Sequence, residues 1–448
     1  MQQSELHPNQ RMATLSTSPP QSRLAGAFRS LRHRNFQLFF AGQLISLIGT
    51  WMQSVAESWL VYRLTGSSLL LGTVAFCAQV PIFLLSPVAG AVVDRRNRHR
   101  IVIATQTTSM LLAFTLAMLT LSHVVRVWQI FVLASLLGFV NAFDIPARQA
   151  FIVEMVGKDD LMNAIALNSS MFNGARIIGP AIAGILVASI GEGWCFFGNS
   201  VSYIAVITGL LMMKVTPREL SHHASALNAI KEGFQWVFNT KPIFSLLLLV
   251  GLVSLVGMPY AVLMPIFADR ILHSGARGLG ILMGFSGAGA LTGALALAAK
   301  SGLKGLGTWV MASSACFGVF LAMFGFSRMF WVSAALLIPV GMFMMVQMAS
   351  TNTLIQSMVP DRLRGRVMSV YSMMMMGMAP LGALLAGGLS NRIGAPLTVA
   401  IGGFCSVLGS IWFGSRLPVL RGEARRLIIA QAYAGGDPPQ EMTTVRED

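Results

Sequence analysis

The sequence predicts an all-α polytopic membrane protein with twelve spanning helices. Of its 448 residues, 54% are hydrophobic and only 11% are charged, whereas a soluble domain carries about 25% charged residues. Its mean hydropathy is +0.67. Twelve apolar runs are long enough to cross a hydrocarbon core of about 30 Å. These runs are too long and too uniformly apolar for barrel strands, which alternate over about ten residues.

The twelve predicted spans form two groups of six. The first six are 36–60, 69–93, 101–121, 127–143, 164–190 and 195–213. The second six are 243–267, 279–299, 306–326, 329–349, 367–389 and 397–413. The predicted division of the chain is a cytoplasmic tail (1–34), a six-helix bundle (35–213), a central loop (214–242), a second six-helix bundle (243–415) and a cytoplasmic tail (416–448).

The central loop carries its own pattern. Leu227, Ile230 and Phe234 recur there at helical spacing. This spacing predicts an amphipathic helix at the inner membrane surface, although a simple tether fits the segment equally well.

The basic residues predict the orientation of the chain. With the amino terminus inside, 25 of the 32 Lys and Arg residues fall in inside segments. This asymmetry follows the positive-inside rule and places both termini in the cytoplasm. The net charge of +15 is therefore explained by the orientation of the chain in the membrane, and we expect no nucleic-acid partner.

An internal repeat relates the two bundles. A shift of 203 residues aligns 152–191 with 355–394, and 12 of these 40 positions are identical. A weaker match pairs Leu71 and Gly72 with Leu279 and Gly280. Two repeats of six helices, facing each other across a cavity at the membrane midplane, explain this pattern.

The loop between spans 2 and 3 reads GAVVDRRNRHR, from Gly90 to Arg100. In a twelve-span repeat it resembles the GxxxDRxxRR signature of the major facilitator superfamily, with His99 displacing one closing basic residue. In that superfamily the loop latches the two halves in the outward-open state. The resemblance therefore implies that Gly90, Asp94, Arg95 and Arg98 form a conformational latch.

Span 5 contains GARIIGPAIAG, which partly resembles a glycine-rich pattern that is associated with exporters of the superfamily. Its glycines and proline predict a helix that bends and packs closely, and ordinary small-residue packing explains them as well. The residues concerned are Gly174, Gly179, Pro180 and Gly184.

Three further stretches narrow the resemblance: NFQLFFAGQLISLIGTWMQSVAESWLVYRLTGS in span 1, DIPARQAF after span 4 and VPDRLRGRVMSV before span 11. They are similar to the branch that contains enterobactin exporters and transmembrane secretion effectors. That branch implies a location in the bacterial inner membrane and does not specify the cargo.

Three charged residues lie in or at the ends of spans. Arg176 is the only basic residue deep in a span, and its repeat equivalent is Ala379. We expect it to face a cavity or a carboxylate, or to clamp backbone carbonyls. Glu57 and Asp144 are candidates for proton coupling, because desolvation favours a protonated carboxyl group. Asp144 could form an ion pair with Arg95 or with Arg148, which is four residues further along the chain. For Glu57 the alternative to proton coupling is a position near the outer headgroups. An ion pair between Glu57 and Arg176 stays an open alternative.

Uncharged polar residues within the spans are candidates for contact with cargo, or for bridging helices. The predicted set is Gln43, Gln53, Asn173, Tyr203, Gln347 and Tyr371. No HExxH, CxxC or GxxxxGK[ST] motif occurs in the sequence. We therefore expect no enzyme, no metal and no cofactor.

The sequence predicts a secondary transporter that works by alternating access. The favoured hypothesis is a proton-coupled exporter of small amphipathic molecules such as siderophores or drugs, whose partners are its cargo, protons and the lipid bilayer. The alternatives are uptake of a small solute by symport and a non-transporting sensor or scaffold. A periplasmic partner stays an open question.

Overall fold

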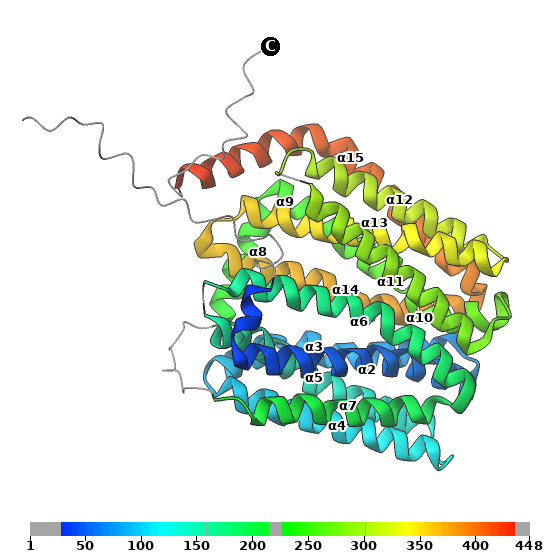
Figure 1. Ribbon diagram of the computed structural model, residues 1–448. Coiled ribbons are helices and arrows are strands. Elements are labelled where there is room, and N and C mark those ends of the chain that lie inside the picture. Colours follow the sequence, from blue (N-terminus) through cyan, green and yellow to red (C-terminus); the bar gives the residue numbers. More distant parts are fainter. Residues whose placement is uncertain (1–27, 158, 215–225, 301, 435–448) are drawn as a thin grey trace, which may run out of the picture.

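The computed structural model describes residues 28–157, 159–214, 226–300 and 302–434. Within these ranges the chain forms long helices that run roughly parallel to one another, as Figure 1 shows. Twelve helical segments in the described ranges are long and apolar enough to cross a membrane. The predicted fold class and number of spans are thereby confirmed.

The first half begins with a short turn, η2 (Arg29–Arg32), and contains six helices. They are α2 (Arg34–Thr65), α3 (Ser68–Asp94), α4 (Arg98–Leu121), α5 (Val127–Val156), α6 (Leu161–Ile190) and α7 (Glu192–Leu211). Local signals separate them: Gly66 ends α2 in a left-handed conformation, and the side chains of Ser67 and Asn97 cap α3 and α4.

The second half begins with a span that prolines interrupt. It consists of α9 (Lys241–Leu252), η3 (Val253–Gly257), α10 (Tyr260–Ile266) and η4 (Phe267–Ile271). The two η segments are π-helical turns; Pro259 lies between η3 and α10, and Pro265 lies inside α10. The other helices are α11 (Gly275–Ala299), α12 (Leu306–Phe326), α13 (Phe330–Met358), α14 (Asp361–Ile393) and α15 (Ala395–Ala434).

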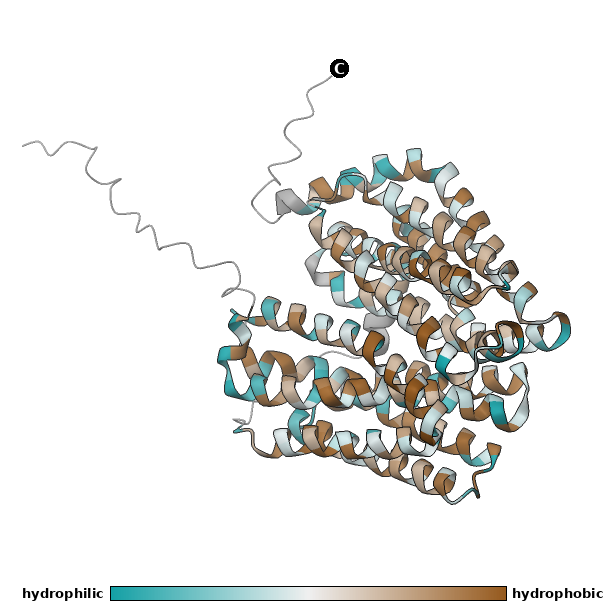
Figure 2. Ribbon diagram, turned by 45° about the vertical axis from the view of Figure 1, so that its right-hand side comes forward, coloured by the Kyte–Doolittle hydropathy of each residue, from teal (hydrophilic) through white to brown (hydrophobic). Residues whose placement is uncertain are grey.

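Both termini of the helical region lie at the same end of the molecule, where α2 begins and α15 ends (Figure 1). We call it the terminal end, and the opposite one the far end. Hydrophobic residues cover the middle of the helices, and hydrophilic ones gather toward the two ends (Figure 2). This distribution fits a bilayer that crosses the helices at mid-length.

Two structural features define the terminal end of the second half. A helix, α8 (Ala226–Asn239), occupies the central segment and is fixed to α14 by an ion pair between Glu232 and Arg366. The last helix continues to Ala434, beyond the predicted boundary at 415. It continues because Leu417 and Leu420 are buried against the core of the second half.

The two halves meet mainly through α3 with α14 and through α6 with α11. The closest approaches pair Gly72 with Gly387 and Gly184 with Gly280. A Cβ atom on Gly280 would lie 2.7 Å from the Cα of Gly184, and one on Gly387 would lie 3.1 Å from the Cα of Gly72. Gly72 and Gly280 lie near the starts of α3 and α11, so these glycine crossings join the halves toward the far end.

Candidate functional site

Four polar residues lie along one face of α2, some buried and one, Thr50, exposed. Ser46, Thr50, Gln53 and Glu57 follow one another at intervals of four, three and four residues, which places them on one helix face. Ser46 and Gln53 are buried. The Oε1 atom of Gln53 accepts a hydrogen bond of 2.7 Å from the Nδ2 atom of Asn199 on α7.

Asp144 is buried between α4 and α5. Its Oδ1 atom accepts hydrogen bonds from Thr105 Oγ1 at 2.8 Å and from Gln106 Nε2 at 2.9 Å. Its Oδ2 atom lies 3.3 Å from the Nη2 atom of Arg148, one turn along α5. Asp144 therefore pairs with Arg148. Arg95, the other candidate partner, is exposed and forms no ion pair with Asp144.

Tyr203 connects these two groups. Its phenol, on α7, lies beside the side chains of Thr50 and Asn199 and close to the charge of Asp144. Asp144, Tyr203, Thr50, Gln53 and Glu57 are polar side chains of neighbouring helices of the first half, which we call the polar file; Thr50 is exposed, and Glu57 is not hydrogen-bonded to the other members. The sequence indicated four of its members, but not that they share one interior.

Glu57 lies at the far-end limit of the polar file, one turn beyond Gln53. Its carboxylate is partly buried and makes no hydrogen bond or ion pair with any residue in the described ranges. An unpaired carboxylate inside a bundle is costly when it is ionised.

Arg176 is partly buried on α6, beside Trp51 of α2. On the same helix, Gly179 packs against Trp51 of α2, and Gly184 packs against Gly280 of α11. Arg176 precedes both glycines on α6, and its guanidinium lies 5.8 Å from the centre of the Trp51 ring. No ion pair joins it to Glu57 or to another described residue. Phe172, one turn earlier, stacks edge-on against Trp51 at 5.6 Å.

The predicted latch residues lie at the terminal end. The Nη1 atom of Arg98 contacts the Oε1 atom of Glu154 on α5 at 2.9 Å. Arg95 is exposed, and a Cβ on Gly90 would meet open space. Asp94 ends α3, and its side chain lies outside the described part of the structure. The structure therefore shows Arg98 bound within the first half.

The glycine-rich segment of α6 has two contact positions. Gly179 meets α2 and Gly184 meets α11, whereas Gly174 faces open space. Pro180 lies inside the helix and is buried. The close-packing interpretation applies to Gly179 and Gly184, where a Cβ would come within 3 Å of neighbouring atoms.

The uncharged polar candidates are all buried. Each of Gln43, Gln53, Asn173, Tyr203, Gln347 and Tyr371 is at most 8% exposed. Asn173 donates to the carbonyl of Ser169, and Tyr371 donates to the carbonyl of Met348. Gln53 and Tyr371 thus bond to other helices, Asn173 bonds within α6, and the amide of Gln347 has no partner among the described residues.

Side-chain contacts at the far end also join the halves. The Tyr62 hydroxyl donates to Asp269 Oδ2 at 2.7 Å, and Arg270 Nη2 donates to the carbonyl of Gly66 at 3.1 Å. Ser68 donates to the carbonyl of Gly387. Sequence reasoning missed this cluster, because Tyr62 and Asp269 are far apart in the chain and only the packed repeat brings them together.

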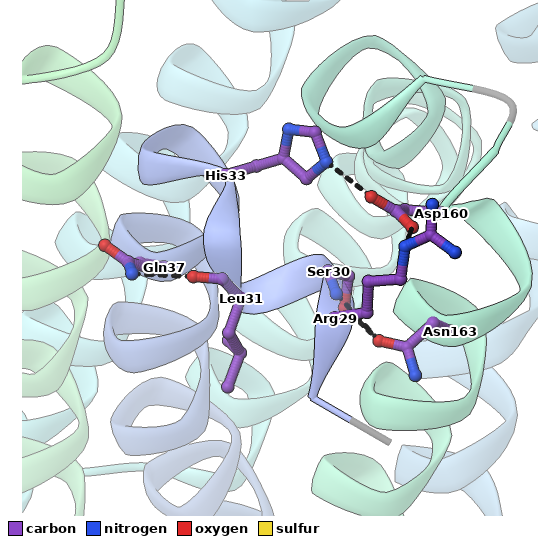
Figure 3. Close-up of polar contacts among 7 residues, drawn as sticks. All are labelled: Arg29, Ser30, Leu31, His33, Gln37, Asp160 and Asn163. Atoms are coloured by element: carbon purple, nitrogen blue, oxygen red, sulfur yellow. Dashed lines mark hydrogen bonds and ion pairs between the residues drawn. The ribbon is translucent and has the colours of Figure 1, made fainter. Parts of the chain in front are cut away.

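A second polar cluster, which sequence reasoning also missed, ties the start of α2 to the start of α6 at the terminal end. Arg29 and His33 both contact Asp160, each at 2.8 Å, and Ser30 donates to Asn163 (Figure 3). All of these residues belong to the first half, so the cluster stiffens that half. No group of three or more His, Cys, Asp or Glu residues suited to a metal ion occurs in the described ranges.

The repeat, the twelve spans and the buried charges define a membrane transporter of the major facilitator type, rather than an enzyme. The model of the transmembrane secretion effector family matches residues 25–439. The chain belongs to this family, which confirms the resemblance found in the sequence.

Characterised relatives cover most of the chain. It is 29% identical to the staphyloferrin A transporter of Staphylococcus aureus, over 82% of this chain and 93% of that protein. It is 30% identical to the multidrug efflux pump Tap of Mycolicibacterium fortuitum, over 78% and 88%. It is 24% identical to the enterobactin exporter EntS of Shigella boydii, over 88% and 93%.

Solved structures share the fold at low sequence identity. The nucleoside transporter NupG superposes with a TM-score of 0.65 at 15% identity, covering 86% of this chain and 99% of that one. A bacterial homologue of ferroportin in an inward-facing state gives 0.64 at 16% identity, covering 87% and 98%.

Proposed function

We propose that this protein exports small amphipathic molecules across the bacterial cytoplasmic membrane in exchange for protons, by alternating access. The observation that carries the proposal is the polar file, which holds two carboxylates inside one half of a transporter fold. Relatives that are named siderophore transporters, an enterobactin exporter and a drug efflux pump support export of this class of cargo.

The proposed orientation places the terminal end in the cytoplasm, because the basic residues concentrate there. The glycine crossings and the Tyr62–Asp269 bond then close the periplasmic side. The described conformation is, on this proposal, inward-facing. In the opposite conformation the segment with Gly90, Asp94, Arg95 and Arg98 latches the cytoplasmic side.

Proton coupling is assigned to Glu57 and Asp144. On this proposal Glu57, which lies nearer the periplasmic side and has no ionic partner among the described residues, takes up a proton when the site opens outward. The carboxyl group of Asp144 contacts Arg148, Thr105 and Gln106. On this proposal the Tyr203 hydroxyl, which lies close to Asp144 and Thr50, takes part in proton movement on the Asp144 side of the file. Release to the cytoplasm follows in the inward-facing state.

Arg176 is assigned to the cargo. A guanidinium within a span, without an acidic partner in the described ranges, attracts an anionic group. Trp51 and Phe172 add an aromatic wall beside it. Asn173, one turn away on α6, supplies a hydrogen-bonding group. The proposed cargo is therefore amphipathic, with an anionic group and an apolar or aromatic body.

Everted membrane vesicles test the proposal. Respiration acidifies their interior, and an exporter that exchanges cargo for protons discharges this gradient when cargo is added outside. We expect anionic siderophores to collapse the gradient with the wild type and not with Glu57→Gln. Lipophilic cations and neutral antibiotics provide the comparison. The matched control is Asp159→Asn, which removes an exposed carboxylate outside the file.

Two outcomes would contradict this proposal. Equal collapse with wild type and Glu57→Gln removes the coupling role of Glu57. No collapse with any compound, together with accumulation of labelled cargo in intact cells, indicates uptake instead of export.

A further inference from the structure

A groove of about 610 Å³ runs between α4 and α5. These two helices pack extensively on each other, on α3 and on α7, all within the first half. The groove is therefore on the side of the first half that faces away from the second. Leu136 and Phe139 on its wall are nearly half exposed. It is a membrane-facing groove, distinct from the space next to Arg176.

The groove extends through one leaflet of the bilayer. Its lining runs along α4 from Arg100 to Leu112. Twelve residues of helix correspond to about 18 Å, and half of a hydrocarbon core is about 15 Å thick. The lining is mostly apolar beyond the first turn of α4. These dimensions and this chemistry suit an acyl chain.

The end of the groove at the terminal side is positively charged. Arg96 and Arg100 line it, both side chains are exposed, and neither forms an ion pair with a described residue. Arg98, in the same loop, is instead bound to Glu154. The amino terminus of α4 adds its dipole at this position. Two free guanidiniums therefore lie where the groove meets the headgroup region.

We propose that this groove binds one anionic phospholipid of the cytoplasmic leaflet. Its acyl chain lies between α4 and α5, and its phosphate contacts Arg96 and Arg100. Basic pockets between spanning helices are suited to anionic headgroups, and the apolar walls require a ligand with a chain. Thr105 lines the same groove and donates to Asp144, so the bound lipid lies one hydrogen bond from the polar file.

Native mass spectrometry of the purified full-length protein tests the site. The protein is equilibrated in mixed micelles of phosphatidylglycerol and phosphatidylcholine, and retained lipids are counted. We expect the wild type to retain phosphatidylglycerol preferentially. Arg96→Gln/Arg100→Gln is expected to lower this preference about fivefold for each arginine removed. Arg425→Gln/Arg426→Gln removes two exposed charges from α15 and is expected to leave it unchanged.

A groove-filling variant separates headgroup attraction from binding of the whole lipid. Ala104→Phe leaves both arginines intact and occupies the apolar part, since Ala104 lines the groove and is exposed. We expect it to lose the retained phosphatidylglycerol. Wild-type retention by Ala104→Phe would overturn the groove as the binding site. If the Arg96/Arg100 and Arg425/Arg426 double variants lost phosphatidylglycerol equally, retention would depend on general surface charge, and the proposal would be overturned.

Discussion

The two halves share a backbone plan and differ in the chemistry of their interiors. The shift of 203 residues carries α5 onto α13, and it places Gln347 where the first half has Asp144. Asp144 has three polar partners. Gln347 is 1% exposed, and neither atom of its amide has a hydrogen-bond partner among the described residues.

The same contrast extends to neighbouring positions. The hydroxyls of Ser254, Ser314 and Ser350 in the second half are also buried without partners. The position equivalent to Arg148 is Thr351, which bonds its own helix backbone. The two halves thus share their helix packing, but the buried Asp144 has no charged equivalent in the second half. We therefore expect the halves to respond differently to equivalent substitutions.

The largest expected difference is between Asp144→Leu and Gln347→Leu. Asp144→Leu leaves the buried amide of Gln106 and the partly buried Arg148 without their acceptor, and each polar group left unsatisfied costs about 1–3 kcal/mol. Thermal unfolding in detergent measures the loss. Asp144→Asn is expected to lower the free energy of unfolding less than Asp144→Leu does. It is also expected to lower proton-driven transport at least tenfold. Wild-type transport by Asp144→Asn would remove Asp144 from the coupling pathway.

The glycine crossings should respond alike, because the repeat relates them. Gly280→Leu and Gly72→Leu each insert a side chain where even a Cβ would overlap neighbouring backbone. Overpacking of this kind costs about 1–3 kcal/mol. Here it destabilises the conformation that is closed at the far end. Cysteine labelling from the periplasmic side should increase in both variants. A response in one variant alone would show that the closure is not symmetric.

Gln347→Leu is expected to raise the free energy of unfolding by about 1 kcal/mol, because it removes an amide that is buried without hydrogen bonds. Thermal unfolding tests this prediction, with Gln347→Asn as the polar control. Destabilisation by leucine would mean that the amide has a partner in the membrane, such as a bound water molecule.

The smallest expected effect concerns Tyr62→Phe. The variant removes the hydrogen bond to Asp269 across the halves, which is worth about 1 kcal/mol. We expect faster opening at the far end, measured by the same labelling. Tyr260→Phe is the control, because Tyr260 bonds to Ser286 within the second half. Equal acceleration in both variants would argue against a gating role for Tyr62.

The sequence predicted the spans well because length and hydropathy alone determine which segments enter a bilayer. It also related Gly184 to Gly387 and Gly72 to Gly280 through the repeat. It did not predict that Gly184 contacts Gly280, since contacts between halves depend on how rigid bundles dock. The π-helical turns η3 and η4 were missed as well, because hydropathy is insensitive to backbone hydrogen bonding.

The candidate site was only partly predictable. The i,i+4 spacing allowed the Asp144–Arg148 pair, but it could not exclude Arg95. The link from Gln53 to Asn199 depends on the rotation of α2 against α7, which packing determines and the sequence pattern of a single helix does not. Trp51 and Phe172 had no polar signal to mark them as neighbours of Arg176.

The glycine crossings have a consequence for the surrounding lipid. Helices that touch through bare backbone are held by dispersion forces, and acyl chains offer nearly the same attraction once the helices separate. Opening at the far end therefore exchanges protein contact for lipid contact with a small net change in energy. The thickness and order of the bilayer then become part of the energetics of the transport cycle, and the same polypeptide will turn over at different rates in fluid and in ordered membranes.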